Sequence, residues 1–287
     1  MPKPDSRLPE VVYTPDSRLQ APLALFKAMG QDLLASRELA WRLLVRDMSA
    51  QYRQSLLGFA WAFIPPIVTA IGLTLANDAK VLNVGATDLP YPAFVMFSMS
   101  LWQTFSEAVN GPIRAVTDAK PMLAKINFPR EAIILSQLGQ IVVNFGVKLI
   151  LIIGLFIWFK MPVTWSVVLA PVALLHLIAL GTCFGLFLAP LGALYQDISK
   201  GLTIGLGVWL FFTPVLFPVP QGSTFGTIVQ LNPVTPLLVT TRELATTGLV
   251  SNPTGFWLAS GFALGGLLLG WLFYRLSMPF VIERMSA

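Results

Sequence analysis

Charged residues are scarce in this sequence. They make up 11% of its 287 residues, whereas hydrophobic residues make up 55%. A soluble domain carries about 25% charged residues, so this composition excludes an ordinary soluble protein. The mean hydropathy of +0.71 agrees with that exclusion. Together the two values predict an integral membrane protein.

Residues that bind metals or form disulfides are almost absent. The chain has one cysteine, Cys183, and one histidine, His176. A disulfide within the chain is therefore excluded, and two such residues are too few for a structural zinc site. We expect no metal ligand among the residues of this chain.

Catalytic signatures are missing as well. The sequence has no Gly-x-x-x-x-Gly-Lys-Ser/Thr phosphate-binding loop, no His-Glu-x-x-His and no Gly-x-Ser-x-Gly. We expect no catalytic residue and no cofactor here. Any ATP and Mg²⁺ that drive the protein would then be bound by another subunit.

A secretory signal is also lacking. Residues 1–55 are polar and carry both signs of charge, without the short apolar core of a signal peptide. We expect this start to stay on the side of the membrane where the protein is made. Its early prolines predict a flexible cytoplasmic extension over residues 1–32.

Long stretches without charge are what the sequence does contain. They occupy residues 56–77, 89–106, 161–196, 201–241 and 244–274. About 20 apolar residues cross a bilayer, so several spans are required. We predict an all-α integral membrane protein with six transmembrane helices, at 56–77, 89–109, 132–158, 166–190, 201–218 and 254–274.

Basic residues are distributed unevenly between the two sides that six spans define. Fifteen of the 19 lie on the side of the termini, four of them in the polar segment 110–131. The remainder are Lys80, Lys160 and Arg242 on the other side, and Lys148 inside the third span. The positive-inside rule then places both termini and the segment 110–131 in the cytoplasm. The net charge of +5 follows from this topology and indicates no nucleic-acid partner.

An amphipathic helix is predicted before the first span, at 33–55. Its apolar positions recur at helical spacing: Leu34, Trp41, Val45, Met48 and Tyr52. Three arginines lie about 100° around the helix from them: Arg42, Arg46 and Arg53. Such a helix lies at the headgroup boundary, where arginines meet anionic lipid. It is either an ordinary juxtamembrane helix or an element that couples or gates a transport path.

Prolines break the apolar region after the fifth span. Those between residues 213 and 247 exclude one continuous helix: Pro214, Pro218, Pro220, Pro233 and Pro236. We predict two short re-entrant helices within 218–247, at 225–231 and 236–245. Irregular backbone at membrane depth must be buried in protein or line a wet cavity, so this region is a candidate outer mouth. The alternative is an external loop without a role in transport.

Three ionisable residues fall inside the predicted spans: Glu107, Lys148 and His176. Such residues are costly in lipid and usually face the interior of the bundle. We expect Glu107 and Lys148 to pair between adjacent spans as a structural brace. We expect His176 to be a buried polar residue rather than a ligand or a proton carrier.

Aromatic residues in or near the spans are candidates for lining a pore. They are Trp61, Trp102, Phe105, Phe211 and Phe212. Aromatic rings can stack on sugar rings, but most rings in such positions anchor the protein in lipid or pack in its core. Both interpretations stay open at the level of sequence.

The polar segment 110–131 has the features of a cytoplasmic docking surface. Its basic residues include Lys120, Lys125 and Arg130, and it ends in Asn-Phe-Pro-Arg-Glu. Pro129 fixes its own φ and disfavours helix at Phe128, which predicts a defined corner before the next span. This segment would suit an ATPase that powers a membrane protein without a phosphate loop of its own.

Several motifs carry a family resemblance over nearly everything after residue 33. They are Val45-Arg46-Asp47, the run 52–61, Tyr91-Pro92, Leu101-Trp102-Gln103-Thr104-Phe105, Asn127-Phe128-Pro129-Arg130-Glu131, Thr213-Pro214-Val215 and Asn232-Pro233-Val234-Thr235. With these motifs the chain resembles the membrane subunits of ABC exporters for bacterial cell-surface polysaccharides, such as O-antigen, capsule and teichoic acid. One departure is Gln196-Asp197, where the family commonly has an Arg-Asp pair.

The resemblance implies an assembly and a function. Two copies of a six-span half-transporter would form a channel in the bacterial inner membrane, each bound to one nucleotide-binding ATPase subunit. The cargo would be a polyprenyl-diphosphate-linked polysaccharide that moves from the cytoplasmic to the outer side. The family's gate helix maps onto 33–55, its coupling segment onto 110–131 and its outer re-entrant region onto 218–247.

Site residues follow from this mapping. Coupling to the ATPase would involve Lys120, Lys125, Phe128, Pro129, Arg130 and Glu131. Binding of the lipid diphosphate, or gating, would involve Arg42, Arg46 and Arg53, which could instead bind anionic headgroups.

Other functions remain open at this point. A proton-driven secondary carrier or flippase would be expected to have more titratable groups along its path. A membrane-embedded transferase would need a cluster of charged residues on one face, which the sequence does not contain. An ABC exporter of a drug or of another lipid is opposed only by the motifs.

Overall fold

The computed structural model describes residues 22–53, 58–81, 84–123, 128–220 and 222–286. Within these ranges every regular element is a helix. The helices are α2 (Pro22–Ala35), α3 (Arg37–Arg53), η1 (Gly58–Ala62), α4 (Ile64–Asp78), α5 (Tyr91–Asp118), α6 (Lys120–Leu123), α7 (Glu131–Trp158), η2 (Trp165–Val168), α8 (Ala170–Leu194), α9 (Gln196–Leu210), α10 (Thr224–Leu231), α11 (Val234–Ala245) and α12 (Pro253–Ser286). The expected all-α fold is confirmed for this part of the chain.

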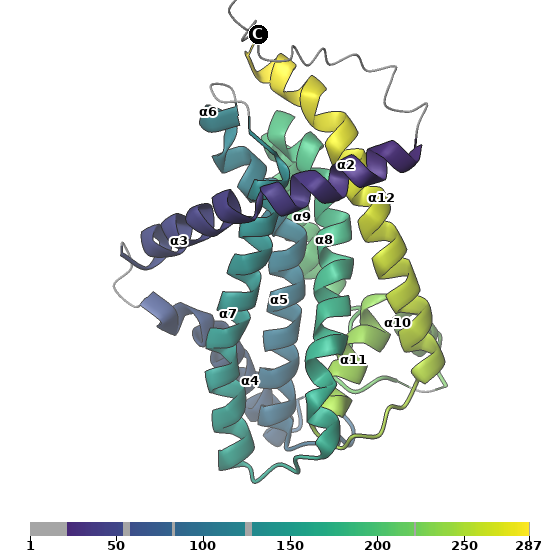
Figure 1. The fold of residues 1–287 in the computed structure, drawn as a ribbon. Coiled ribbons are helices and arrows are strands. Elements are labelled where there is room, and N and C mark those ends of the chain that lie inside the picture. The colour runs from purple at the N-terminus through teal and green to yellow at the C-terminus, as the bar shows by residue number, and fades with distance from the viewer. Residues whose placement is uncertain (1–21, 54–57, 82–83, 124–127, 221, 287) are drawn as a thin grey trace, which may run out of the picture.

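Helices α5 and α8 form the centre of the bundle. In Figure 1, α5, α7 and α8 stand side by side as long columns, with α4 behind them and α12 inclined beside α8. Glycines let α5 and α8 approach closely. A Cβ at Gly181 would lie 2.7 Å from the Ala108 Cβ, and one at Gly185 would lie 2.6 Å from the Val109 carbonyl oxygen. Larger residues at these two positions would therefore force the two helices apart.

Within the described ranges, four segments are long and apolar enough to cross a membrane. They are Ala60–Asp78, which includes α4, together with α7, α8 and α12. The other two predicted spans correspond to α5 and α9. Helix α9 has 15 residues and is therefore about 22 Å long. It ends at Leu210 rather than at 218, because turns and Pro214 follow it.

Prolines have different effects in α4 and α5. Pro65 and Pro66 lie in the first turn of α4, where a missing N–H costs nothing, and so they begin the helix. Pro112 lies inside α5, which continues to Asp118. The predicted loop 110–131 is therefore helical as far as 118, and its inner side is buried through Ile113 and Val116.

The amphipathic region consists of two helices instead of one. Helix α2 starts at Pro22, so the expected flexible extension 1–32 is helical from 22 onward, and residues 1–21 lie outside the described part. Helices α2 and α3 meet at Ser36, whose backbone N–H and hydroxyl both bond to the Asp32 carbonyl oxygen. Figure 1 shows the pair crossing the bundle near the end at which α12 terminates.

The apolar face that the sequence predicts for residues 33–55 points away from the helix bundle. Leu34, Trp41 and Val45 are exposed, as a helix at a lipid boundary requires. The inward face of α3 contains Leu43 and Leu44 and packs against α7. Sequence periodicity did not identify this second apolar face.

The outer region contains the two short helices that the sequence predicted. Helix α10 matches the expected 225–231 within one residue, and α11 starts two residues before the expected 236. Almost every residue of α11 is buried, because the helix packs between α5, α8 and α12. The segment is thus part of the bundle and not a loose external loop.

Candidate functional site

The predicted coupling segment ends in a corner formed by Phe128, Pro129, Arg130 and Glu131, called the corner below. Phe128 packs against an apolar cluster that includes Val116, Ile133 and Tyr274. Pro129 is exposed, and Arg130 is half-buried at the start of α7. The corner therefore presents one side to solvent and anchors the other in the end of the bundle at which α12 terminates.

Glu131 does not lie on the docking surface that the sequence predicted. Its carboxylate is buried, and Arg275 of α12 donates to it with 2.7 Å between Nη1 and Oε1. Arg275 Nη2 also contacts Asp32 Oδ2 of α2, at 2.5 Å. The hydroxyl of Tyr274 lies 3.4 Å from the Arg130 carbonyl oxygen. Glu131 thus supports the corner from within.

The predicted docking lysines differ in position. Lys120 is half-buried in the short helix α6, while Lys125 lies outside the described residues. Arg114 and Asp118 are exposed on the last turns of α5. Among the described residues, the accessible charge of this surface comes from the end of α5, from α6 and from Arg130.

The arginines of α3 lie at the surface. Arg42 pairs with Glu38 at 2.6 Å, and Arg46 pairs with Asp47 at 2.7 Å. Both pairs are solvent-exposed and contribute little to stability. The side chain of Arg53, at the end of α3, lies outside the described residues. Two of the three predicted arginines are therefore placed where an anionic group can reach them.

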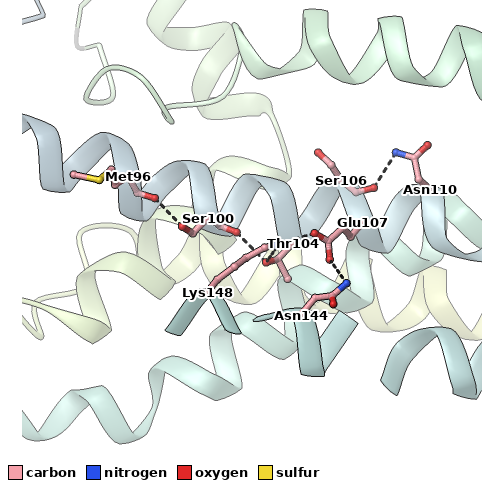
Figure 2. A network of polar contacts seen from close by, with 8 residues as sticks. All are labelled: Met96, Ser100, Thr104, Ser106, Glu107, Asn110, Asn144 and Lys148. Atoms are coloured by element: carbon pink, nitrogen blue, oxygen red, sulfur yellow. Dashed lines mark hydrogen bonds and ion pairs between the residues drawn. The ribbon is translucent and has the colours of Figure 1, made fainter. Parts of the chain in front are cut away.

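A polar network joins α5 and α7 in the middle of the bundle (Figure 2). Lys148 is 2% exposed, and its Nζ lies 2.6 Å from Glu107 Oε1. Asn144 donates to the other Glu107 oxygen at 3.3 Å, and Lys148 also reaches Thr104 Oγ1 at 3.4 Å. The predicted pairing of Glu107 and Lys148 is confirmed.

This network is continued toward α3. Gln140 lies one turn of α7 before Asn144, and its Nε2 donates to Asp47 Oδ2 at 3.2 Å. Residues 140, 144 and 148 share one face of α7, as their spacing of four requires. The polar face of α7 thus connects α3 with the buried ion pair.

Two of the predicted pore aromatics are core residues. Trp102 and Phe105 are 5% and 0% exposed. They pack with Trp209 and Phe184, with ring centroids 5.3–6.4 Å apart. Offset and edge contacts at this distance are typical of stable aromatic packing. Trp102 and Phe105 are therefore enclosed within a single chain, and their place in a pore stays a prediction.

The other three aromatics remain accessible. Trp61 and Phe211 are exposed, and Phe212 is at the border of exposure, next to Phe225 of α10. They lie beside α4 and at the end of α9, whose outward faces are apolar through Val68, Ile71, Ile204 and Val208. These faces can meet lipid or another protein.

Asn232 organises the outer region. Its Oδ1 accepts from Trp209 Nε1 and from the Val234 backbone N–H, both at 3.1 Å. Its Nδ2 donates to the Phe212 carbonyl oxygen and to Thr213 Oγ1, both at 2.9 Å. The sequence marked Asn232 only as part of the motif Asn232-Pro233-Val234-Thr235. One side chain in fact holds α9, the turn after it and α11 together.

Arg242 is a second residue whose role the sequence missed. The distribution of charge along the sequence places it among the outer charges, yet it is buried in α11 with its guanidinium 4.1 Å from the centre of the Phe94 ring. Its Nη1 donates to Ser98 Oγ at 2.8 Å. A buried cation needs such partners. The burial of Arg242 could not be predicted from the sequence, because the residues that enclose it are distant along the chain.

His176 is also less buried than expected. It is partly exposed on α8, where a ring nitrogen lies 2.7 Å from the Val172 carbonyl oxygen and the ring packs on Phe256. Among the described residues, no group of three or more His, Cys, Asp or Glu side chains is placed to hold a metal ion.

Comparisons with known proteins identify a family and several relatives. Residues 38–244 match the ABC-2 type transporter family. An "O-antigen export system permease protein RfbA" from Myxococcus xanthus is 28% identical over 221 residues, covering 75% of this chain and 82% of the relative. Two proteins of that name from Klebsiella pneumoniae are 24% and 22% identical over 214 residues, covering 71% and 72% of this chain and 78% and 79% of the relatives.

The family match extends over well over half of the sequence. It includes α3, the corner, the Glu107–Lys148 pair and both short helices of the outer region. The chain therefore belongs to the ABC-2 type transporter family, as a membrane subunit of a transporter.

Proposed function

We propose that this chain is the permease subunit of an ATP-driven exporter that moves O-antigen-type polysaccharide, linked to polyprenyl diphosphate, to the outer side of the bacterial inner membrane. The observation that carries the proposal is the family match over 38–244, together with relatives that are named O-antigen export permeases. The work of the chain is movement of a substrate, and ATP and Mg²⁺ are held by a separate subunit.

The membrane topology of the proposal has six spans, α4, α5, α7, α8, α9 and α12. Helices α10 and α11 then form a re-entrant outer region. Two features support this topology. The strongly basic segments lie on one side of it, and the ion pairs of Arg275 bring α2, the corner and α12 together at one end of the bundle. Both termini are cytoplasmic in this arrangement.

The ATPase docks on the cytoplasmic surface formed by the end of α5, α6 and the corner. Lys120, Lys125, Pro129 and Arg130 provide the contact, while Phe128 and Glu131 hold the corner to the bundle. The half-buried Phe128 and the buried Glu131 support this division, because side chains packed inside the chain transmit force instead of binding a partner.

The channel forms between two copies of the chain. The exposed apolar faces of α4 and α9 support this arrangement, since they are the least buried surfaces among the proposed spans of the central bundle. Trp61, Phe211 and Phe212 are the aromatics positioned to contact the glycan. Arg42 and Arg46 on α3 are positioned to meet the lipid diphosphate at the headgroup boundary.

The experiment is a reconstitution with the partner ATPase. The purified complex is placed in lipid vesicles, and ATP hydrolysis and transfer of lipid-linked glycan into the vesicle lumen are measured together. We expect export that requires ATP and stops when the phosphate-loop lysine of the ATPase is replaced. Export driven by a proton gradient without the ATPase would instead identify a secondary carrier and overturn the proposal.

A second measurement addresses the docking surface. Lys120→Ala/Arg130→Ala should release the ATPase during co-purification and abolish glycan-stimulated hydrolysis, because it removes the positive charge beside the corner. The matched control is Lys27→Ala/Arg37→Ala, which removes two exposed positive charges from α2 and α3. Equal retention of the ATPase by both variants would rule out docking at the corner.

A further inference from the structure

Arg275 joins three helices through two ion pairs. From its place on α12, its Nη1 holds Glu131 at the corner, where α7 begins, and its Nη2 holds Asp32 on α2. We propose that Arg275 is a positioning residue through which movement of the corner reaches the α2–α3 helix pair. This inference rests on the proposed function, because it concerns how ATP-driven movement is passed on.

The buried half of the arrangement makes α12 and the corner one unit. The side chains of Arg275 and Glu131 are 12% and 8% exposed, so solvent does little to screen their attraction. The neighbouring Tyr274 is fully buried, and its hydroxyl lies against the Arg130 carbonyl oxygen. Two consecutive residues of α12 therefore hold both the backbone and the carboxylate of the corner.

The ion pair between Arg275 and Asp32 is more accessible to solvent. The Asp32 side chain is 43% exposed, so water can replace the guanidinium as its partner. A planar guanidinium can also hold two carboxylates at once, which a lysine ammonium on a flexible stem does less well. The contact between Asp32 and Arg275 is thus the weaker of the two, and its removal should disturb the corner least.

Asp32 is also the joint between α2 and α3. Its carbonyl oxygen accepts bonds from the Ser36 N–H at 2.9 Å and from the Ser36 hydroxyl at 2.6 Å. Ser36 is buried, and α3 begins at the next residue. A displacement of Arg275 that carries the Asp32 side chain with it is therefore passed to the start of α3. The same helix presents Arg42 and Arg46 at the surface.

These contacts form a path along which movement passes from the corner to α3. The ATPase moves the corner, the corner and α12 move together through Glu131 and Tyr274, and α3 follows through Asp32 and Ser36. Removing the Asp32 carboxylate should leave the ATPase site, the corner and the bundle intact. It should disconnect α3 from them.

The test uses the reconstituted permease–ATPase complex and the variant Asp32→Asn. We expect wild-type protein level, thermal stability and ATP hydrolysis, with glycan export per ATP reduced at least about fivefold, the lower end of typical coupling between sites. Asp32→Glu, which keeps the negative charge, should retain most of the export. Arg275→Lys should lower export per ATP in the same direction.

The matched control is Glu38→Gln. It removes an exposed carboxylate and its 2.6 Å pair with Arg42 from the same helix pair, without touching the corner. Wild-type export per ATP in Asp32→Asn would overturn the inference, as would equal losses of export and ATP hydrolysis, which indicate a merely structural contact. Absence of ATP-driven export in the wild type would instead contradict the proposed function, so the two failures are distinguishable.

Discussion

Lys148 of α7 and Glu107 of α5 form an ion pair of 2.6 Å in which the lysine side chain is almost fully enclosed. Transfer of a charge out of water is costly, and the cost is offset only while its partner stays in place. Glu107 is 31% exposed and also accepts from Asn144, so the pair sits at the edge of the network. The register of α5 against α7 therefore depends on both members being present.

Replacing one member of this pair should destabilise the protein more than replacing both. Lys148→Met leaves the Glu107 carboxylate unpaired and should destabilise the chain by about 3 kcal/mol. The double variant Glu107→Gln/Lys148→Met should recover most of that loss. The measurement is the temperature at which the detergent-solubilised protein loses its monodisperse peak. A double variant no more stable than the single one would contradict the pairing argument.

Asn232→Ala should strongly destabilise the outer region. The substitution leaves the Trp209 N–H without its partner and removes the bonds to the Phe212 carbonyl and Thr213 hydroxyl. Unsatisfied buried groups cost about 1–3 kcal/mol each. Asn252→Ala is the control, because Asn252 makes one exposed cap bond to the Gly255 N–H and its loss should cost about 1 kcal/mol. Similar melting temperatures for both variants would argue against the buried role.

Trp102→Ala and Phe105→Ala should lower protein level and glycan export together. Both rings are buried in the aromatic cluster around Trp209, and truncation of a buried aromatic costs about 3–5 kcal/mol. Phe211→Ala, at an exposed position, should leave protein level unchanged while changing export. Quantitative immunoblots alongside export assays separate these outcomes. If Trp102→Ala lost export at full protein level, Trp102 would instead be assigned to the pore.

Arg242 and Phe94 should be energetically coupled. Their contact places a buried cation 4.1 Å from the ring centre, and such contacts contribute about 1–2 kcal/mol when water is excluded. The thermal stabilities of Arg242→Met, Phe94→Leu and the double variant should therefore be non-additive by that amount. Arg242→Met alone should be the most destabilising of the single changes, since Ser98 also loses its donor. Additive effects would show that the ring contributes only apolar packing.

Much of the helical organisation is predictable from the sequence. Charge-free stretches located α8 and α12, and prolines located the break between α10 and α11. The pairing of Glu107 with Lys148 was predictable because ionisable residues in adjacent spans have few alternatives to each other. Pro129 correctly indicated a corner before α7.

Other features could not be predicted from the sequence, because the hydropathy that identifies a membrane protein is the same on all of its apolar faces. Lipid and protein interior are equally apolar, so hydropathy does not tell which side of a helix meets which. Trp102 was therefore indistinguishable from Phe211, although one is buried and the other exposed. The inner face of α3 was hidden for the same reason.

The sequence by itself determined that this chain is a membrane protein and where its long apolar segments and its basic residues lie, because these depend on local composition summed along the chain. The tertiary structure alone decided that Glu131 supports the corner from inside, that Arg242 is buried, and that Arg275 joins Asp32 to Glu131. Each of these depends on partners far away in sequence, and only packing of the helices brings such partners within bonding distance.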